Sequence, residues 1–397
     1  MCIHSWRWFG PDDPVTLDQV VQTGAVNIVT ALHQIPVGTV WPADQIRQRK
    51  ELIEASGLTW TVVESVPVHE DIKTRTGNYR ECIDNFRQTL VNLGREKIST
   101  LCYNFMPALD WSRTSLTERN RDGSQRSGFE FIHFAALDIH LLKRPDAEAS
   151  YPASVRKQAK SYFERLDEGG LKELEDTFLL GFPGSGESFS LEEVLQRIDR
   201  YRKIDRNIYM SNLLKFLREI VPVAEEQGIK LAIHPDDPPW PLLGLPRVVS
   251  TLHDAEEIIR AVDSPANGIT FCTGSFGAAW TNDLPSMAKQ LAHRINFLHI
   301  RNVVRDEGYN FHEENLLEGD VNVAGIIETM VLEDLSREKR IPGYTGIPVR
   351  PDHGAKILDD FRQNTYPGYS LYGRLKNLSE IRGLEAGIRQ SLRSARP

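Results

Sequence analysis

The chain has 397 residues, 40% of them hydrophobic, and a formal net charge of −8 at neutral pH. Its usage is that of a globular protein, and no apolar run reaches the roughly 20 residues that span a bilayer. The negative charge and the lack of a dense Lys/Arg tract argue against nucleic acid as a partner, because such binding depends on neutralising phosphates. A small acidic substrate is still compatible with this charge, since a local cluster of arginines can oppose it.

The N-terminus and the cysteines indicate the compartment and its redox chemistry. The first residues, Met-Cys-Ile-His-Ser-Trp-Arg-Trp, lack the basic and then apolar segments of a signal peptide, so we expect a cytoplasmic location. The four cysteines, at positions 2, 82, 102 and 272, show no paired spacing. This excludes a CxxC zinc knuckle and argues against a disulfide scaffold.

Short apolar runs alternate with helical patterns along most of the chain. Strands are predicted at residues 5–9, 25–31, 58–64, 98–103, 230–234, 268–272, 295–300 and 347–350. Helices are predicted at residues 43–56, 79–93, 212–227, 247–262, 285–294, 323–334 and 375–392. Eight strands with helices between them predict an α/β fold, a (β/α)8 TIM barrel. A doubly wound sheet also accommodates alternating units, but its phosphate-binding Gly-x-Gly-x-x-Gly turn is absent.

The alternation breaks after the fourth predicted strand. Residues 112–209 are rich in charge, carry several amphipathic helical patterns and contain Gly-Phe-Pro-Gly-Ser-Gly-Glu at 181–187. We therefore expect a single TIM-barrel domain over residues 1–397 with a large helical insertion at 112–209 between strands four and five. The insertion is expected to form a lid over the barrel mouth or a peripheral subunit contact. Residues 65–71 are predicted to form a loop at the same face, and residues 303–319 are predicted to be a loop.

The last four predicted strands each end in a residue that binds metals well. These residues are His234, Cys272, His299 and Asp352. The carboxyl ends of barrel strands gather on one face, so the four side chains are expected to converge there as a transition-metal site. A lone histidine or cysteine at such a place is more often structural, but coincidence explains four in succession poorly. The carboxylate and the open coordination positions admit Mn²⁺ or Fe²⁺, and zinc is also chemically plausible.

His353 and Tyr369 are the candidates for proton transfer. His353 follows Asp352 directly, and Tyr369 lies in a turn-rich aromatic segment at 367–374. An imidazole titrates near neutral pH, and a phenol beside a cation can act as an acid or a base. Tyr369 also fits a packing role, and Tyr372 is a weaker candidate for the same chemistry.

Several polar residues at strand ends or in the adjoining loops are candidates for binding a substrate. Arginines in these places can hold a carboxylate in bidentate geometry, although at least one is expected to pair with a neighbouring acid instead. The candidates are Arg7, His69, Asn104, Arg301, Asn302, Arg350 and Tyr372, with Arg374 as a further arginine. Asp236 and Asp237 either orient metal ligands or begin a loop at the substrate pocket, and we favour the loop.

Distinctive segments extend from residue 5 nearly to the C-terminus. They include Arg7-Trp-Phe-Gly10, Glu64-Ser-Val-Pro-Val-His69, Cys102-Tyr-Asn-Phe-Met-Pro107, Ala232-Ile-His-Pro-Asp-Asp237, Gly268-Ile-Thr-Phe-Cys272, Ile295-Asn-Phe-Leu-His299, Arg350-Pro-Asp-His-Gly354 and Pro367-Gly-Tyr-Ser-Leu-Tyr-Gly-Arg374. In these segments the chain resembles the metal-dependent mannonate dehydratases with xylose-isomerase-like barrels, and it does not resemble the enolase-type enzymes of the same activity. Residues 112–205 carry no matched segment.

This resemblance implies loss of water from D-mannonate to give 2-dehydro-3-deoxy-D-gluconate, in hexuronate breakdown. It implies one Mn²⁺ or Fe²⁺ ion on His234, Cys272, His299 and Asp352, with proton transfer by His353 and Tyr369. We expect Tyr369 to be the base and His353 the acid, and the protein to be a homodimer or higher homo-oligomer.

Two other functions are compatible with a metal on this barrel. The first is a metal-dependent sugar or sugar-acid isomerase, against which the cysteine ligand argues, since such sites rely mostly on carboxylates. The second is a non-catalytic protein with a structural zinc. Closed zinc sites are usually built from local ligand pairs, so ligands spread over four strands argue against it.

Overall fold

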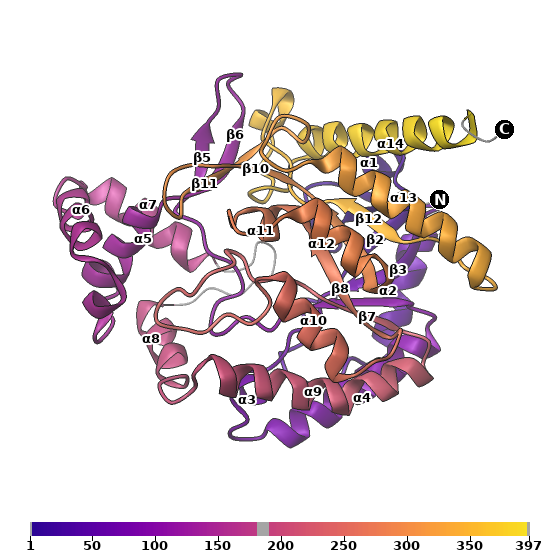
Figure 1. Cartoon of the computed structure of the whole chain (residues 1–397), viewed down its shortest axis with the longest axis horizontal. Helices are drawn as coiled ribbons and strands as arrows, with labels where there is room; N and C mark the ends of the chain where they lie inside the picture. Colours follow the sequence, from indigo (N-terminus) through magenta and orange to yellow (C-terminus); the bar gives the residue numbers. More distant parts are fainter. Residues whose placement is uncertain (1, 181–189, 395–397) are drawn as a thin grey trace.

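The computed structural model describes residues 2–180 and 190–394, and the predicted segment at 181–187 lies outside them. The central strands are β1 (Ile3–Arg7), β2 (Asn27–Thr30), β3 (Thr59–Glu64), β4 (Thr100–Tyr103), β7 (Lys230–Ile233), β8 (Asn267–Cys272), β9 (Ile295–Ile300) and β12 (Pro348–Pro351). They form a closed barrel in the order β1-β12-β9-β8-β7-β4-β3-β2, and neighbouring strands are parallel (Figure 1). The predicted (β/α)8 TIM barrel is confirmed, and no strand bound differs from the prediction by more than two residues.

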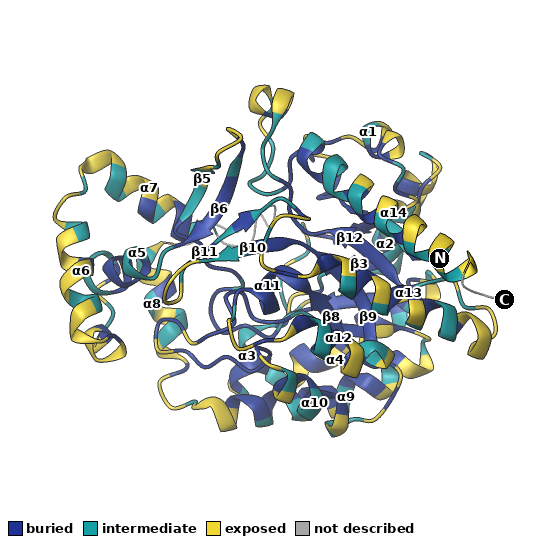
Figure 2. Cartoon of the chain, turned by 45° about the horizontal axis from the view of Figure 1, so that its top comes forward, coloured by how far each residue is buried: buried dark blue, intermediate teal, exposed yellow. Residues whose placement is uncertain are grey.

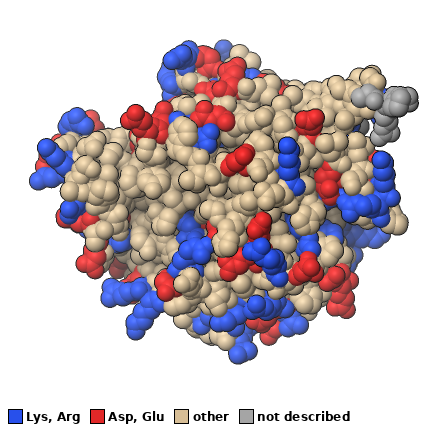
Figure 3. Space-filling model, in the orientation of Figure 1, with Lys and Arg blue, Asp and Glu red and all other residues tan. Residues whose placement is uncertain are grey.

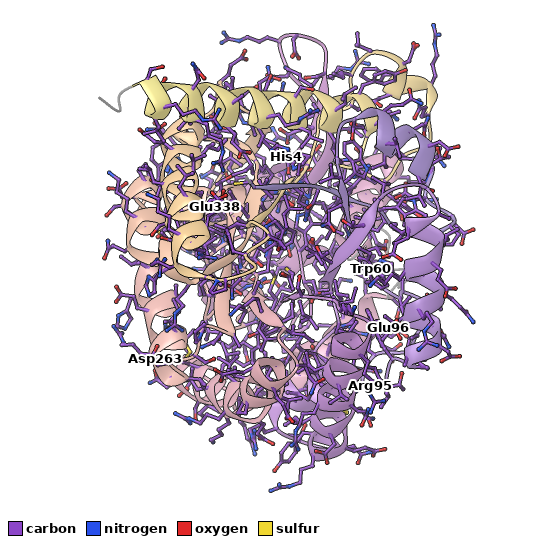
Figure 4. The ribbon with its side chains drawn as sticks, turned by 90° about the vertical axis from the view of Figure 1, so that its right-hand side faces the viewer. His4, Trp60, Arg95, Glu96, Asp263 and Glu338 are labelled. Carbon is purple, nitrogen blue, oxygen red and sulfur yellow. The ribbon has the colours of Figure 1, made fainter. Side chains whose placement is uncertain are left out.

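Helices surround the barrel, and most of them bury one face against it (Figure 2). They are α1 (Leu17–Gln22), α2 (Ala43–Glu54), α3 (Glu70–Thr74), α4 (Tyr79–Arg95), α9 (Arg206–Glu226), α10 (Leu252–Ala261), α11 (Thr273–Gly277), α12 (Leu284–Leu291), α13 (Val323–Arg340) and α14 (Leu371–Ser394). Several begin at a side chain that accepts a backbone N–H, as Thr251 does for α10 and Asp205 for α9. The last helix, α14, crosses near the start of the chain, where His4 Nε2 lies 2.8 Å from Glu385 Oε2 (Figure 4).

The barrel interior contains a small apolar cluster of its own, separate from the main core. Its members are the fully or nearly fully buried residues Val29, Val62, Cys102, Ala232 and Phe297. Side chains two residues apart on a strand share a face, so the residues two positions further along also face inward. Glu64, His234 and His299 are three of these. They form the polar layer directly above the apolar cluster, at the carboxyl ends of the strands.

The insertion between β4 and α9 contains a hairpin as well as helices. The hairpin strands are β5 (Ser115–Arg119) and β6 (Gln125–Phe129), and the helices are α5 (Phe131–Ala136), α6 (Ala153–Phe163), α7 (Glu168–Leu179) and α8 (Leu191–Asp199). The hairpin joins β10 (Asn302–Arg305) and β11 (Phe311–Glu314) in a four-stranded sheet, in the order β10-β11-β6-β5. The helices of the insertion gather beside the barrel, at the left of Figure 1.

Of the two loop predictions, the one for residues 303–319 is wrong in part, and the one for residues 65–71 holds as far as His69. Residues 303–319 contain β10 and β11, because β11 pairs with β6 of the insertion, Phe311 opposite Phe129. Because the partner strand is remote in the sequence, no local sequence pattern indicates this pairing. In residues 65–71 the chain already enters α3, where His69 Nδ1 accepts the N–H of Asp71 at 3.1 Å. Both elements are too short for a periodic signal.

The outer surface carries charges of both signs. On the face shown in Figure 3, Lys and Arg side chains are interspersed with Asp and Glu. None of the helices in residues 2–180 and 190–394 combines the length and the apolar character needed to cross a bilayer.

Candidate active site

A cavity with about 540 Å³ of space free of protein atoms opens at the carboxyl ends of the barrel strands. Its lining residues are Glu64, Ser65, Cys102, Tyr103, Asn104, Met106, Asp110, Trp111, His234, Asp237, Arg350, Asp352, His353 and Tyr369. The structure therefore brings predicted ligands and predicted proton-transfer residues to one cavity.

The four predicted metal ligands lie together. One donor atom each of His234, Cys272 and His299 lies within 4.8 Å of the others. Asp352 adjoins this group, with Oδ2 3.3 Å from Cys272 Sγ and Oδ1 3.6 Å from His299 Nδ1. A divalent cation needs donors at about 2.0–2.3 Å from its centre, so donors separated by a few ångströms suit a single ion.

The hydrogen bonds of the two histidines are compatible with metal binding. His234 Nδ1 lies 2.7 Å from the carbonyl oxygen of Pro235, which can only accept, so Nδ1 carries the proton. This tautomer leaves a lone pair on Nε2 of His234. In His299, Nε2 lies 3.4 Å from Glu64 Oε2, and Nδ1 lies 3.6 Å from Asp352 Oδ1. Nitrogen, sulfur and carboxylate donors gathered in a buried group are ligands of divalent transition metals, so the residues present fit a metal ion.

Asp352 is held in its ionised form. Burial alone would raise its pKa, but the nearby His353, Arg350, Arg301 and His299 hold the pKa well below the usual range. Arg350 Nη1 lies 2.9 Å from Oδ1, and Arg301 Nε lies 3.2 Å from Oδ2. A carboxylate rather than a carboxylic acid is the form that ligates a cation.

His353 and Tyr369 lie side by side at the cavity, with ring centroids 5.2 Å apart in an edge-on arrangement. Burial raises the pKa of the Tyr369 phenol, and the cation of Arg350 partly opposes this. The turn before Tyr369 requires glycine, because Gly368 has φ +78° and an added Cβ would lie 3.0 Å from His353 Cγ. The close approach of this turn fixes the two rings relative to each other.

The arginines predicted to bind substrate are engaged by the protein. Arg350 donates to both carboxylate oxygens of Glu64, at 3.0 and 2.7 Å. Arg374 donates to the carbonyl oxygens of Arg7, Ser370 and Tyr369, and burial lowers its pKa to about 10. Arg7 is buried with its guanidinium 4.9 Å from the ring centre of Phe9. We infer that they organise the walls of the site.

Of the other residues predicted to bind substrate, some line the cavity and some do not. Asn104 lines the cavity, whereas His69, Asn302 and Tyr372 are not among its lining residues. The Asn302 amide donates to the carbonyl oxygens of Leu316 and Val321 and thereby shapes the loop after β11.

Comparison with known proteins agrees with this geometry. Residues 2–395 match the family model described as D-mannonate dehydratase (UxuA). The chain belongs to the D-mannonate dehydratase family. It is 52% identical over 388 residues to the mannonate dehydratase of Chromohalobacter salexigens, covering 98% of this chain and 99% of that protein.

Solved structures show the same likeness. The crystal structure of mannonate dehydratase from Streptococcus suis serotype 2 has a TM-score of 0.77 and 32% identity, with 99% of this chain and 96% of that chain covered. A xylose isomerase-like TIM barrel protein from Mycobacterium smegmatis, solved with magnesium, has a TM-score of 0.50 at 14% identity, with 98% and 97% covered. This second likeness extends to the fold alone.

In this member of the mannonate dehydratase family, sequence patterns did not reveal a network of buried charges behind the cavity. Arg113, from the insertion, donates to both oxygens of Asp237 at 2.7 and 3.1 Å. Arg301 donates to Asp237 at 2.7 Å and to Glu313 at 2.9 Å. The sequence around each of these residues does not indicate the ion pairs, because the partners come from three distant segments. Of the two acids after His234, Asp237 borders the cavity, while Asp236 accepts the N–H groups of residues 248 and 249.

Replacing Arg113 with alanine is expected to destabilise this fold by about 3 kcal/mol, the cost typical of breaking a buried ion pair. Burial would raise the pKa of Asp237, but Arg113 and Arg301 hold it well below its usual range. A carboxylate with a lowered pKa contributes stability above about pH 4 and loses it as pH falls further. Urea unfolding should therefore show that the substitution lowers the free energy of unfolding strongly at pH 7 and less at pH 3.

The matched control is Arg202→Ala, which removes an exposed pair with Asp199 at 3.0 Å. Such surface pairs contribute about 0.5 kcal/mol or less. Equal effects of the two substitutions would contradict a structural role for the buried pair.

Proposed function

We propose that the chain dehydrates D-mannonate to 2-dehydro-3-deoxy-D-gluconate in this cavity, with one divalent cation held by His234, Cys272, His299 and Asp352. The observation that supports this most is the convergence of these four side chains at the cavity of a chain of the mannonate dehydratase family.

The reaction sets two chemical demands. The proton on C2 lies beside a carboxylate and is very weakly acidic in water, and the hydroxyl on C3 is a poor leaving group unless it is protonated. When bound, the cation supplies Lewis-acid stabilisation of the negative charge that develops on the substrate as the C2 proton departs. Two further groups must then handle protons, one at C2 and one at the C3 oxygen.

Tyr369 and His353 are our proposal for these two groups. We assign proton removal from C2 to Tyr369, whose ionised form is favoured by the neighbouring Arg350 although burial raises its pKa. We assign protonation of the leaving hydroxyl to His353, which borders the same cavity. The departing C3 hydroxyl takes the proton of His353 and leaves as water, and the electron pair of the C2–H bond forms the C2–C3 double bond. The enol product then becomes the 2-keto acid.

The surroundings of these groups can orient the substrate. Asn104 lines the cavity with an amide that can both donate to and accept from sugar hydroxyls. Arg350 and Arg301 bracket Asp352 and so keep the carboxylate in place. We propose Mn²⁺ or Fe²⁺ as the ion, because the carboxylate and the open coordination positions admit both ions and the imidazole donors suit Fe²⁺.

Incubation with D-mannonate tests the proposed activity directly. The metal-loaded protein is expected to form a 2-keto-3-deoxy acid with loss of one water, measured by mass spectrometry and by a colour assay for the keto acid. Treatment with a chelator should abolish product formation, and added Mn²⁺ or Fe²⁺ should restore it.

A product of unchanged mass would instead indicate the isomerase alternative. The homo-oligomeric state and the cytoplasmic location stay predictions, as does a lid or subunit-contact role for the helices in 112–209.

A further inference from the structure

Glu313, on strand β11, contacts ring nitrogen Nδ1 of the proposed acid His353. Its Oε1 lies 2.5 Å from His353 Nδ1, and both side chains are buried. Burial alone would raise the pKa of Glu313, but His353, Arg301 and Arg113 lower it to about 2. The group facing Nδ1 is therefore a carboxylate at neutral pH.

The surrounding donors decide which ring nitrogen of His353 carries the proton. Arg301 Nη1 donates to Glu313 Oε1 at 2.9 Å and lies 3.2 Å from His353 Nδ1. The shorter contact of Nδ1 is with the carboxylate, which can only accept, so Nδ1 donates to Glu313. This hydrogen bond leaves Nε2 as the ring nitrogen that exchanges a proton with a ligand in the cavity.

The position of Glu313 depends on the insertion. Strand β11 lies between β10 and β6 in the sheet, and β6 belongs to the hairpin of the insertion. From the same segment, Arg113 reaches within 3.9 Å of Glu313 Oε1 and binds Asp237, which in turn accepts from Arg301. The insertion thus helps to position the residues that His353 contacts.

We propose that Glu313 is a positioning residue that fixes the tautomer and orientation of His353, and that the hairpin β5–β6 serves to hold it there. The inference depends on the proposed proton-transfer role of His353. In other enzymes a carboxylate behind a catalytic histidine acts in this way.

The test compares Glu313→Gln with Glu314→Gln, one residue along the same strand. The Glu313→Gln side chain keeps the shape of the glutamate but can turn its amide N–H₂ toward Nδ1 and favour the wrong tautomer. We expect kcat for D-mannonate to fall about 100-fold, a smaller loss than the ~10⁴-fold that the equivalent change causes in a serine protease. KM and bound metal per chain should stay within twofold of the original protein, as a positioning role requires. Glu313→Asp, which keeps the charge, should recover at least tenfold of the lost kcat.

The control residue Glu314 points away from His353 and pairs with Arg126 and Asn120. Glu314→Gln should keep kcat within twofold. The inference is overturned if Glu313→Gln keeps kcat within threefold, or if its KM and metal content change in step with kcat. Where the glutamine variant does not fold, Glu313→Ala, which removes the carboxylate, takes its place, and a kcat within threefold of the original protein there also overturns the inference.

His353→Asn, measured in parallel, separates the two proposals. If His353→Asn keeps turnover, the role of His353 itself is wrong. If it loses turnover while Glu313→Gln keeps it, only the role of Glu313 is wrong.

Discussion

Replacing Cys272 with serine is expected to remove bound metal and dehydratase activity together. Cys272 Sγ lies 3.3 Å from Asp352 Oδ2 and belongs to the donor group with His234 and His299. A hydroxyl is a far poorer ligand than a thiolate for a borderline-soft ion. Losing several kcal/mol of charge stabilisation corresponds to a fall of about 10³-fold or more in kcat/KM. Metal analysis of the purified variant and the D-mannonate assay check both effects.

Cys102→Ser is the matched control, because Cys102 belongs to a second group of possible ligands with Glu64 and His299. Burial raises the pKa of the Cys102 thiol well above its usual value, which disfavours a thiolate there. The hydroxyl that replaces the thiol still has a partner, since Thr270 Oγ1 lies 3.2 Å from the present sulfur. This variant should keep its metal. Metal loss in Cys102→Ser with retention in Cys272→Ser would place the ion in the second group instead.

Tyr369→Phe and His353→Asn are expected to keep the metal and lose turnover. Neither side chain belongs to the donor group, yet both line the cavity. Removing a general acid or base typically costs about 10²–10⁴-fold in rate. Steady-state kinetics with D-mannonate, together with metal analysis, measures this separation.

Tyr372→Phe is the control for Tyr369, because Tyr372 is not among the residues lining the cavity. It should change kcat by less than threefold. Full activity in Tyr369→Phe would remove that phenol from the mechanism.

The barrel and the convergence of the four strand-end residues were predictable because both depend on local order. Each strand is a short apolar run, and the residue that ends it is carried to the common face by the fold itself. His234, Cys272 and His299 are thus placed by their strands, and the structure brings them together with Asp352.

The buried charged residues next to the cavity were not predictable, because their contacts depend on segments that are remote in the sequence. Glu313 lies on a four-residue strand whose partner, β6, comes from the insertion. Asp237 has its partners Arg113 and Arg301 on two segments remote from it in the sequence. Such contacts depend on tertiary packing, which leaves no period or spacing in the local sequence. The pairing of Arg350 with Glu64 agrees with the expectation that at least one of these arginines binds a neighbouring acid, but the local sequence did not show which one.

Anomalous diffraction at the manganese edge, from crystals of the protein loaded with Mn²⁺, tests the central claim most directly. We predict one strong peak bounded by a ring nitrogen of His234, Cys272 Sγ, a ring nitrogen of His299 and a carboxylate oxygen of Asp352. A peak elsewhere, or no peak in crystals of protein that turns over D-mannonate, would contradict it.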